Sequence, residues 1–231
     1  MKSRFVIRLL AVMVVIYSCQ ESKAQKNDWQ REGLKGRVKE AKDVTYTVRD
    51  KSGKISNRDI ALDYSKVFDV NGNLIALVFH NRNADTVKTN IKNKFDEKGN
   101  RVEKSSYVLD TILMDRYEYK FDDKGNDVEW EAYNDLGAMY RKGICKYDDK
   151  GNKIEESVYD SKNTFINRSV FRYDKSGNIA EEDSYVESNK LINTATNKYE
   201  FDSKGNWITQ KVYIPQFKNP RNITKREIIY Y

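Results

Sequence analysis

The sequence predicts an all-β protein, a single antiparallel meander of about fourteen strands built from hairpin repeats of ~26 residues. The motif Asp-x-x-Gly-Asn occurs six times in the 231 residues, and the spacings between its glycines are 27, 26, 26, 26 and 28. An aromatic residue precedes every motif, and the flanking segments alternate apolar with polar residues. Because these segments are rich in Tyr, Val, Ile and Thr, each repeat favours two strands over a helix.

The N-terminal residues predict export. A basic start and an apolar run over residues 5–17 are typical of a signal peptide, and the run is shorter than the ~20 apolar residues that cross a bilayer. Residues 16–19 resemble a lipobox, and the alternative is ordinary cleavage after Ala24. We favour lipid attachment at Cys19, with the signal peptide inside residues 1–24. This predicts a lipoprotein of the cell surface, outer membrane or periplasm, and the alternative is a secreted soluble protein.

Residues 25–35 are expected to form a short linker, and residues 36–231 to form the β domain. Each Asp-x-x-Gly-Asn motif is predicted to be a hairpin turn, in which Asp accepts backbone hydrogen bonds and Gly adopts a positive φ. A degenerate hairpin, whose second strand begins at Ile55, precedes the six copies, and residues 223–231 supply a last strand.

Charges on either side of the turns predict the strand register. In four copies a cation two residues before the motif matches a glutamate four residues after its glycine. The pairs are Lys94/Glu103, Lys120/Glu129, Lys146/Glu155 and Arg172/Glu181. We predict that these residues are cross-strand partners, and that the aromatic residue before the motif faces the apolar residue three after the glycine. One face then carries Tyr119, Phe121, Val128 and Trp130 with their counterparts, and the other carries the charged pairs.

A flat sheet of this width would expose one long aromatic face, which soluble proteins avoid. Twist accumulates with strand number, so the sheet should bend over that face. The sequence therefore predicts a single strongly curled sheet or an incomplete barrel, with a β-sandwich as the second possibility.

A tyrosine stands eight residues after the motif glycine in five copies, and we name this set the Tyr column. Its members are Tyr107, Tyr133, Tyr159, Tyr185 and Tyr213. Strict alternation places the Tyr column on the charged face, where its rings would bind an extended glycan or protein, with Trp130 and Trp207 at a neighbouring surface. The alternative is that bulges at the outer turns rotate these rings into the core.

Composition excludes several function classes. The chain has 42 Lys and Arg against 35 Asp and Glu, and this mild surplus is scattered, so we expect no nucleic-acid partner. The single histidine, His80, nearly excludes His-based triads and His-rich metal sites. Glu155 and Glu156 are neighbours on a predicted strand and point to opposite faces, which disfavours a glycosidase pair. We expect no enzyme activity, no cofactor and no metal, and membrane contact only through a lipid anchor.

Residues 119–126 and 146–152 resemble the YD repeats of RHS-type bacterial surface proteins, and the resemblance extends over residues 60–210. Residues 205–208 and 226–231 resemble the corresponding parts of small YD-repeat lipoproteins of Bacteroidetes-type bacteria. The resemblance implies an antiparallel β-shell and, for some members, an association with carbohydrate. Asn follows the motif glycine where RHS repeats usually have Arg, so encapsulation is not implied.

The function that these observations predict is an exported, non-enzymatic binding or scaffold module for an extended ligand, either glycan or protein. The alternatives are an accessory domain of a carbohydrate-active enzyme, or an immunity or specificity partner of a secreted protein.

Overall fold

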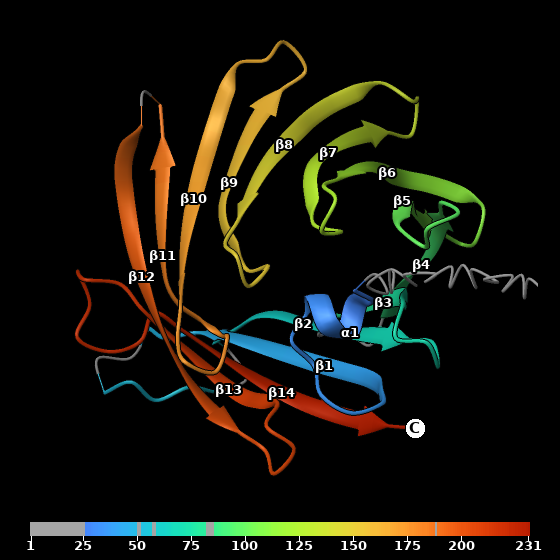
Figure 1. The fold of residues 1–231 in the computed structure, drawn as a ribbon. Coiled ribbons are helices and arrows are strands. Elements are labelled where there is room, and N and C mark those ends of the chain that lie inside the picture. Colours follow the sequence, from blue (N-terminus) through green and yellow to red (C-terminus); the bar gives the residue numbers. More distant parts are fainter. Residues whose placement is uncertain (1–25, 50–51, 57–58, 82–85, 188) are drawn as a thin grey trace, which may run out of the picture.

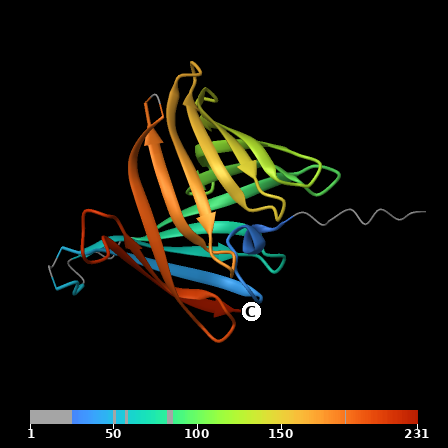
Figure 2. The ribbon, with the colours of Figure 1, turned by 60° about the vertical axis from the view of Figure 1, so that its left-hand side comes forward.

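The computed structural model describes residues 26–49, 52–56, 59–81, 86–187 and 189–231. The predicted signal peptide, with Cys19 and Ala24, lies outside these residues. The described chain forms a short helix, α1 (Asp28–Arg31), and fourteen antiparallel strands (Figures 1 and 2). The strands are β1 (Val38–Thr47), β2 (Ile60–Phe68), β3 (Leu74–His80), β4 (Thr86–Phe95), β5 (Arg101–Val108), β6 (Ile112–Phe121), β7 (Asp127–Asn134), β8 (Met139–Tyr147), β9 (Lys153–Asp160), β10 (Phe165–Tyr173), β11 (Ile179–Val186), β12 (Lys190–Phe201), β13 (Trp207–Tyr213) and β14 (Asn222–Tyr230).

The strands form a closed barrel in sequence order, because β1 pairs with β14 as well as with β2. The all-β meander and the strand number are confirmed, but the expected open, curled sheet or incomplete barrel is wrong. Twist accumulated over fourteen strands returns β14 to β1, and pairing the two leaves no free edge. The second strand begins at Ile60 rather than at Ile55.

The predicted register is confirmed for all four charged pairs, each of which joins Cα partners of adjacent strands. The predicted pairing of the aromatic residue is wrong, because Phe121 faces Asp127 instead of Val128. The register shifts by one residue between Lys120 and Phe121, so the strand after the turn carries a β-bulge. The extra residue is Val128, which is not among the buried core residues. Ile154, at the same position of a later copy, is 36% exposed.

The motif turns are held by their own side chains, as predicted. Asp122 Oδ1 accepts hydrogen bonds from the backbone N–H groups of Lys124 and Asn126, both at 2.9 Å. The N–H of Gly125 donates to the carbonyl of Asp122, and the glycine has a φ of +78°. The two carboxylate hydrogen bonds recur in the other five copies.

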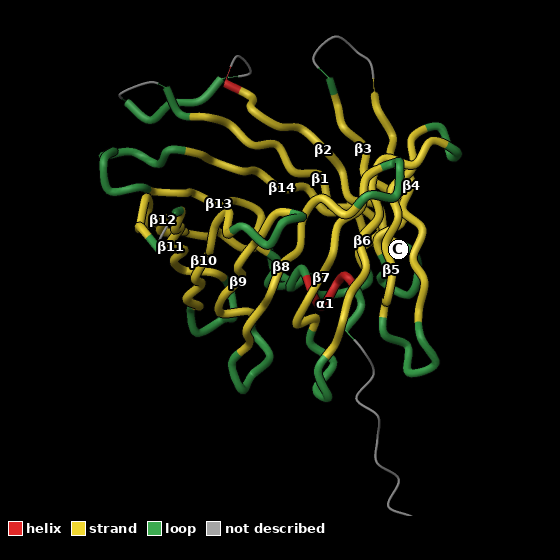
Figure 3. Tube along the Cα trace, turned by 90° about the horizontal axis from the view of Figure 1, so that it is seen from above, coloured by secondary structure: helices red, strands yellow, loops and turns green. Residues whose placement is uncertain are grey.

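Residues 26–37, which we name the N-terminal segment, include α1 and run across the barrel at the end formed by the motif turns. The described part of the expected linker, residues 26–35, is structured and includes α1. Figure 1 shows α1 inside the ring of strands, and Figure 3 shows it toward one end of the barrel. The Trp29 N–H donates to the carbonyl of Gly72, and Lys26 Nζ donates to the carbonyl of Gly151. The Lys35 N–H donates to Asn206 Oδ1 at 2.7 Å. The N-terminal segment thus joins turns that are far apart in sequence.

The apolar core is small and lies where the N-terminal segment meets β1 and β2. Its buried members are Leu34, Val38, Ala41 and Phe68, and Trp29 packs against them. The Trp29 indole Nε1–H also donates to the carbonyl of Val38 at 2.8 Å. This cluster couples the N-terminal segment to the strands that close the barrel.

A buried ion pair joins the two strands that close the barrel. Asp43 on β1 and Arg226 on β14 are Cα partners, and their side chains are 4% and 3% exposed. Two hydrogen bonds of 2.6 Å run from Arg226 Nε and Nη2 to the two carboxylate oxygens. The Tyr64 hydroxyl donates to the same carboxylate at 3.3 Å, and burial raises the pKa of Tyr64, which keeps this hydroxyl protonated.

Candidate functional site

A cavity of about 560 Å³ lies inside the barrel, between α1 and the inward side chains of the strands. Aromatic rings form much of its wall. They are Tyr117, Tyr119, Trp130, Tyr147, Tyr173, Tyr199 and Trp207. Small polar ligands are commonly bound in such sites, where rings supply contact area and a few polar groups fix the orientation.

Three of the cavity tyrosines repeat at intervals of 26 residues and are held in the same way. The hydroxyls of Tyr147, Tyr173 and Tyr199 donate to backbone carbonyls of the preceding strand, at 3.1, 2.7 and 2.9 Å. Burial raises the pKa of all three, so the hydroxyls stay neutral donors. Rings fixed in this way line the cavity in an ordered position, which lowers the entropic cost of binding a ligand against them.

Trp130, one of the two tryptophans of the cavity, is also held in place. Trp130 Nε1 donates to Glu156 Oε1 at 2.9 Å, and its ring centroid lies 5.8 Å from that of Tyr117. The ring lies directly over Gly143, where an added Cβ would come within 2.2 Å of the indole. Glycine is therefore required at position 143 for Trp130 to keep its place.

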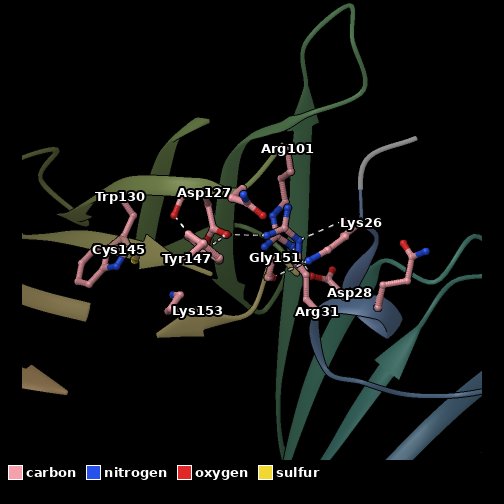
Figure 4. A network of polar contacts seen from close by, with 12 residues as sticks. Lys26, Asp28, Arg31, Arg101, Asp127, Trp130, Cys145, Tyr147, Gly151 and Lys153 are labelled. Atoms are coloured by element: carbon pink, nitrogen blue, oxygen red, sulfur yellow. Dashed lines mark hydrogen bonds and ion pairs between the residues drawn. The ribbon is translucent and has the colours of Figure 1, made fainter. Parts of the chain in front are cut away.

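Ion pairs connect α1 to the cavity wall (Figure 4). Asp28 accepts from Arg101 Nη1 at 2.7 Å, and it also accepts from the backbone N–H of Leu74 at 2.7 Å. Arg31 Nη1 lies 3.1 Å from Asp127 Oδ1. The Tyr147 hydroxyl donates to the same oxygen at 2.7 Å, and this bond helps to hold the pKa of Asp127 below its usual value although burial acts the other way.

The structure separates the predicted site residues into two groups. Trp130 and Trp207 line the cavity, whereas the Tyr column lies on the outer, charged face, as strict alternation predicts. Tyr133 is the Cα partner of Arg116, whose guanidinium lies over its ring and bonds to Glu118 of the charged face. The bulges at the outer turns therefore do not rotate this ring into the core.

Every ring of the Tyr column has a cation over one face. The pairs are Lys92–Tyr107, Arg116–Tyr133, Lys142–Tyr159, Arg168–Tyr185 and Lys198–Tyr213, with distances to the ring centroid of 4.5, 4.3, 5.8, 4.3 and 5.1 Å. The hydroxyl of Tyr133 also donates to Glu131, which raises the pKa of Tyr133 to about 12. Whether the column binds a ligand stays a prediction.

The two neighbouring glutamates and the free cysteine can also be placed in the structure. Glu155 pairs with Lys146 on the outer face while Glu156 accepts from Trp130 inside, so these two acids do point to opposite sides. Cys145 is buried, and burial raises the pKa of its thiol to about 12. Within the described residues, the His, Cys, Asp and Glu side chains form no group of three that could hold a metal ion.

A second column of residues lines the cavity, and Trp207 is the one member that we identified as a candidate from the sequence. Its members stand two positions after each motif glycine, and they are Leu74, Arg101, Asp127, Lys153, Ile179 and Trp207. Each is the Cα partner of the aromatic residue before its motif. The fixed spacing is visible in the sequence. The six side chains differ in charge and polarity, however, so no shared residue type indicates that they lie on one face.

No helix in the described part of the chain is both long enough and apolar enough to cross a membrane. No family model matches the sequence, and no curated protein matches it. A porin-like protein from Bacteroides uniformis is a structural match with a TM-score of 0.52 and 8% identity, covering 90% of this chain and all of that one. The likeness shows a shared fold.

Two further structural matches have low TM-scores. The TcdB2-TccC3-Cdc42 structure gives a TM-score of 0.29 at 10% identity, over 79% of this chain and 11% of that chain. A DUF1329 family protein from Desulfovibrio piger gives 0.27 at 11% identity, over 83% and 84% of the two chains. Neither score carries an argument, and membership of the YD-repeat family stays a prediction.

Proposed function

We propose that this protein is an exported, non-enzymatic binding module, and that its ligand is a polar, ring-bearing molecule such as a saccharide held in the barrel cavity. The observation that carries the proposal is the cavity wall, in which seven aromatic rings surround about 560 Å³. A volume of that size is typical of small-molecule sites, which range over roughly 300–1,000 Å³.

The charges of the cavity support binding rather than catalysis. Asp28 and Asp127 of the cavity wall, and Glu156 beside the wall residue Lys153, are each engaged by a cation, at 2.7, 3.1 and 3.2 Å. The pKa of Glu156 is lowered, mainly by Lys153 acting against burial, so this carboxylate stays ionised. Paired, ionised carboxylates are suited to orienting a ligand and are poor general acids.

A second candidate is binding of an extended glycan or protein along the Tyr column. The observation that favours it is repetition, because equivalent strands lie two strand spacings apart and present like rings every ~9.6 Å. The cavity is the stronger candidate, since a cation already covers one face of each ring in the Tyr column.

Two variants distinguish these candidates. Trp130→Leu removes a cavity ring, and the triple variant Tyr133→Ser, Tyr159→Ser, Tyr185→Ser removes outer rings. On a glycan array followed by titration calorimetry, we expect Trp130→Leu to weaken binding about tenfold and the triple variant to leave it unchanged. The reverse result would assign binding to the Tyr column. Melting temperatures provide the control, because a variant that unfolds reports on architecture.

The outer surface of the barrel supports a position in water beside a membrane. On β6 the charged side chains of Arg116, Glu118 and Lys120 occupy three successive outward positions. A lipid-facing barrel surface needs an apolar band ~25 Å tall, and these charges interrupt such a band on this strand. We therefore propose that lipid attachment, rather than the barrel, holds the protein at the membrane.

The proposed anchor is tested at Cys19. The variant Cys19→Ala should lose fatty-acid labelling in a bacterial host and leave the membrane fraction, because the acylated thiol is the attachment point. If mass spectrometry shows that the wild-type protein starts at Gln25 and fractionates as a soluble protein, the anchor proposal is wrong.

A further inference from the structure

We infer that the cavity contains an anion subsite, formed by Arg31, Arg101 and Lys104, which binds an acidic group carried by the ligand. The inference rests on the proposed function, and it adds the charge of the ligand to it. All three side chains line the cavity, Arg31 from α1 and the other two from consecutive inward positions of β5.

The two guanidinium groups have donors left over after their ion pairs. Arg101 gives Nη1 to Asp28, yet its Nε is buried and has no acceptor among the described residues. Arg31 gives Nη1 to Asp127, and its buried Nη2 is likewise without an acceptor in the described part of the chain. A buried donor without a partner destabilises the protein, so an oxygen anion that accepted from both groups would bind favourably.

Lys104 adds a third cation. Its ammonium lies 4.8 Å from the ring centroid of Tyr117, and no carboxylate in the described ranges lies within 4.0 Å of it. Burial lowers the pKa of Lys104, and the neighbouring charge of Arg101 lowers it further. Asp115, Asp28 and Glu32 act in the opposite direction on this pKa, each with a smaller effect than Arg101. The site thus holds like charges close together, which a bound anion would relieve.

Charge over the whole cavity agrees with this reading. Five cations line it against three carboxylates, and they are Lys26, Arg31, Arg101, Lys104 and Lys153 against Asp28, Glu32 and Asp127. Figure 4 shows Arg31, Arg101 and Lys26 gathered beside Asp28 at the α1 side of the cavity.

Aromatic rings border the subsite and define the class of ligand. Arg101 lies 5.2 Å from the ring centroid of Tyr119, and the rings of Tyr119 and Tyr117 stack at 6.4 Å. A ligand that offered a ring to these tyrosines would place a substituent near the cations. The matching chemistry is an oxygen anion on a sugar-like ring, either the carboxylate of a uronic acid or a sugar phosphate.

The test measures the affinity of the full chain for glucuronate, glucose 1-phosphate and glucose. Binding is detected through the fluorescence of the cavity residues Trp130 and Trp207. We expect at least one of the two acids to bind ten times more tightly than glucose. Lys104→Met should weaken binding of the acids more than binding of glucose, so that the tenfold difference between them is lost. The matched control is Lys142→Met, which also removes an ammonium over a tyrosine ring but on the outer face, and it should change neither affinity.

Stability provides a second measurement. In buffer without multivalent anions, Lys104→Met should raise the melting temperature, because it replaces an ammonium that has no nearby carboxylate by an apolar side chain of similar volume. A lower melting temperature would show that Lys104 serves the fold and would overturn the inference.

The outcomes of binding separate the two proposals. If glucose binds as tightly as both acids, the anion subsite is overturned while the cavity remains a binding site. If none of the three compounds binds, the inference is overturned together with the function on which it rests.

Discussion

Arg226→Ala is expected to lower the free energy of unfolding by about 3–5 kcal/mol, the largest effect of any single charge removal in the barrel. The substitution leaves the Asp43 carboxylate buried between β1 and β14 without its cation. It also removes the guanidinium that lies 3.4 Å from the ring centroid of Trp207. Equilibrium unfolding in urea, followed by the fluorescence of the three tryptophans, measures the loss.

The control replaces both partners. Asp43→Leu combined with Arg226→Met removes both charges and keeps an apolar contact, so it should recover most of the stability that the single substitution loses. Strong non-additivity between the two sites is expected because each partner is almost fully enclosed. A loss below about 1 kcal/mol for Arg226→Ala would contradict the burial of the pair, since exposed ion pairs have effects of that size.

Trp29→Ala is expected to lower the free energy of unfolding by about 3–5 kcal/mol, because it removes a large side chain from the cluster around Val38 and Phe68. Trp29→Phe is the matched variant. It keeps a ring in the cluster and loses the hydrogen bond to the Val38 carbonyl, so its cost should be about 1 kcal/mol. Similar losses for the two variants would show that the hydrogen bond, rather than packing, holds the N-terminal segment.

Two glycines of the motif turns test the contact between the Trp29 ring and the turn at Gly72. Gly72 and Gly99 have φ values of +85° and +82°, so alanine is strained equally at both, by about 1–2 kcal/mol. At Gly72 a Cβ would also lie 2.5 Å from the Trp29 ring, whereas at Gly99 no atom lies within 4 Å. Gly72→Ala should therefore destabilise the protein more than Gly99→Ala. Equal effects would mean that Trp29 does not rest on this turn in solution.

The local parts of the fold could be predicted from the sequence because their signals lie within one repeat. Lys120 and Glu129 are separated by a turn of fixed length, so complementary charge was enough to set their register. The bulge beside them was missed, since it preserves the charged pair while moving Phe121 opposite Asp127. Alternation placed the Tyr column on the charged face for the same local reason.

Closure and the cavity depend on residues that no repeat relates. Asp43 and Arg226 are 183 positions apart, and their complementary charge has no meaning until β14 is known to reach β1. The anion subsite also depends on closure of the barrel, because Arg31 on α1 approaches Arg101 only after the N-terminal segment enters a closed ring. The alternation of apolar and polar residues within each hairpin predicts neither the pairing of β1 with β14 nor the position of the N-terminal segment inside the barrel.

The pairing of β1 with β14 also determines the order in which the protein can be completed. Each hairpin can form as soon as its own two strands are synthesised, but β1 keeps an unpaired edge until Asn222–Tyr230 is available. An unpaired strand edge is a template for another chain, and long-range pairing is slow compared with local pairing. During biogenesis the C-terminal strand therefore acts as an intramolecular protector of the N-terminal one, and the interval before it arrives is when the nascent chain most needs a chaperone.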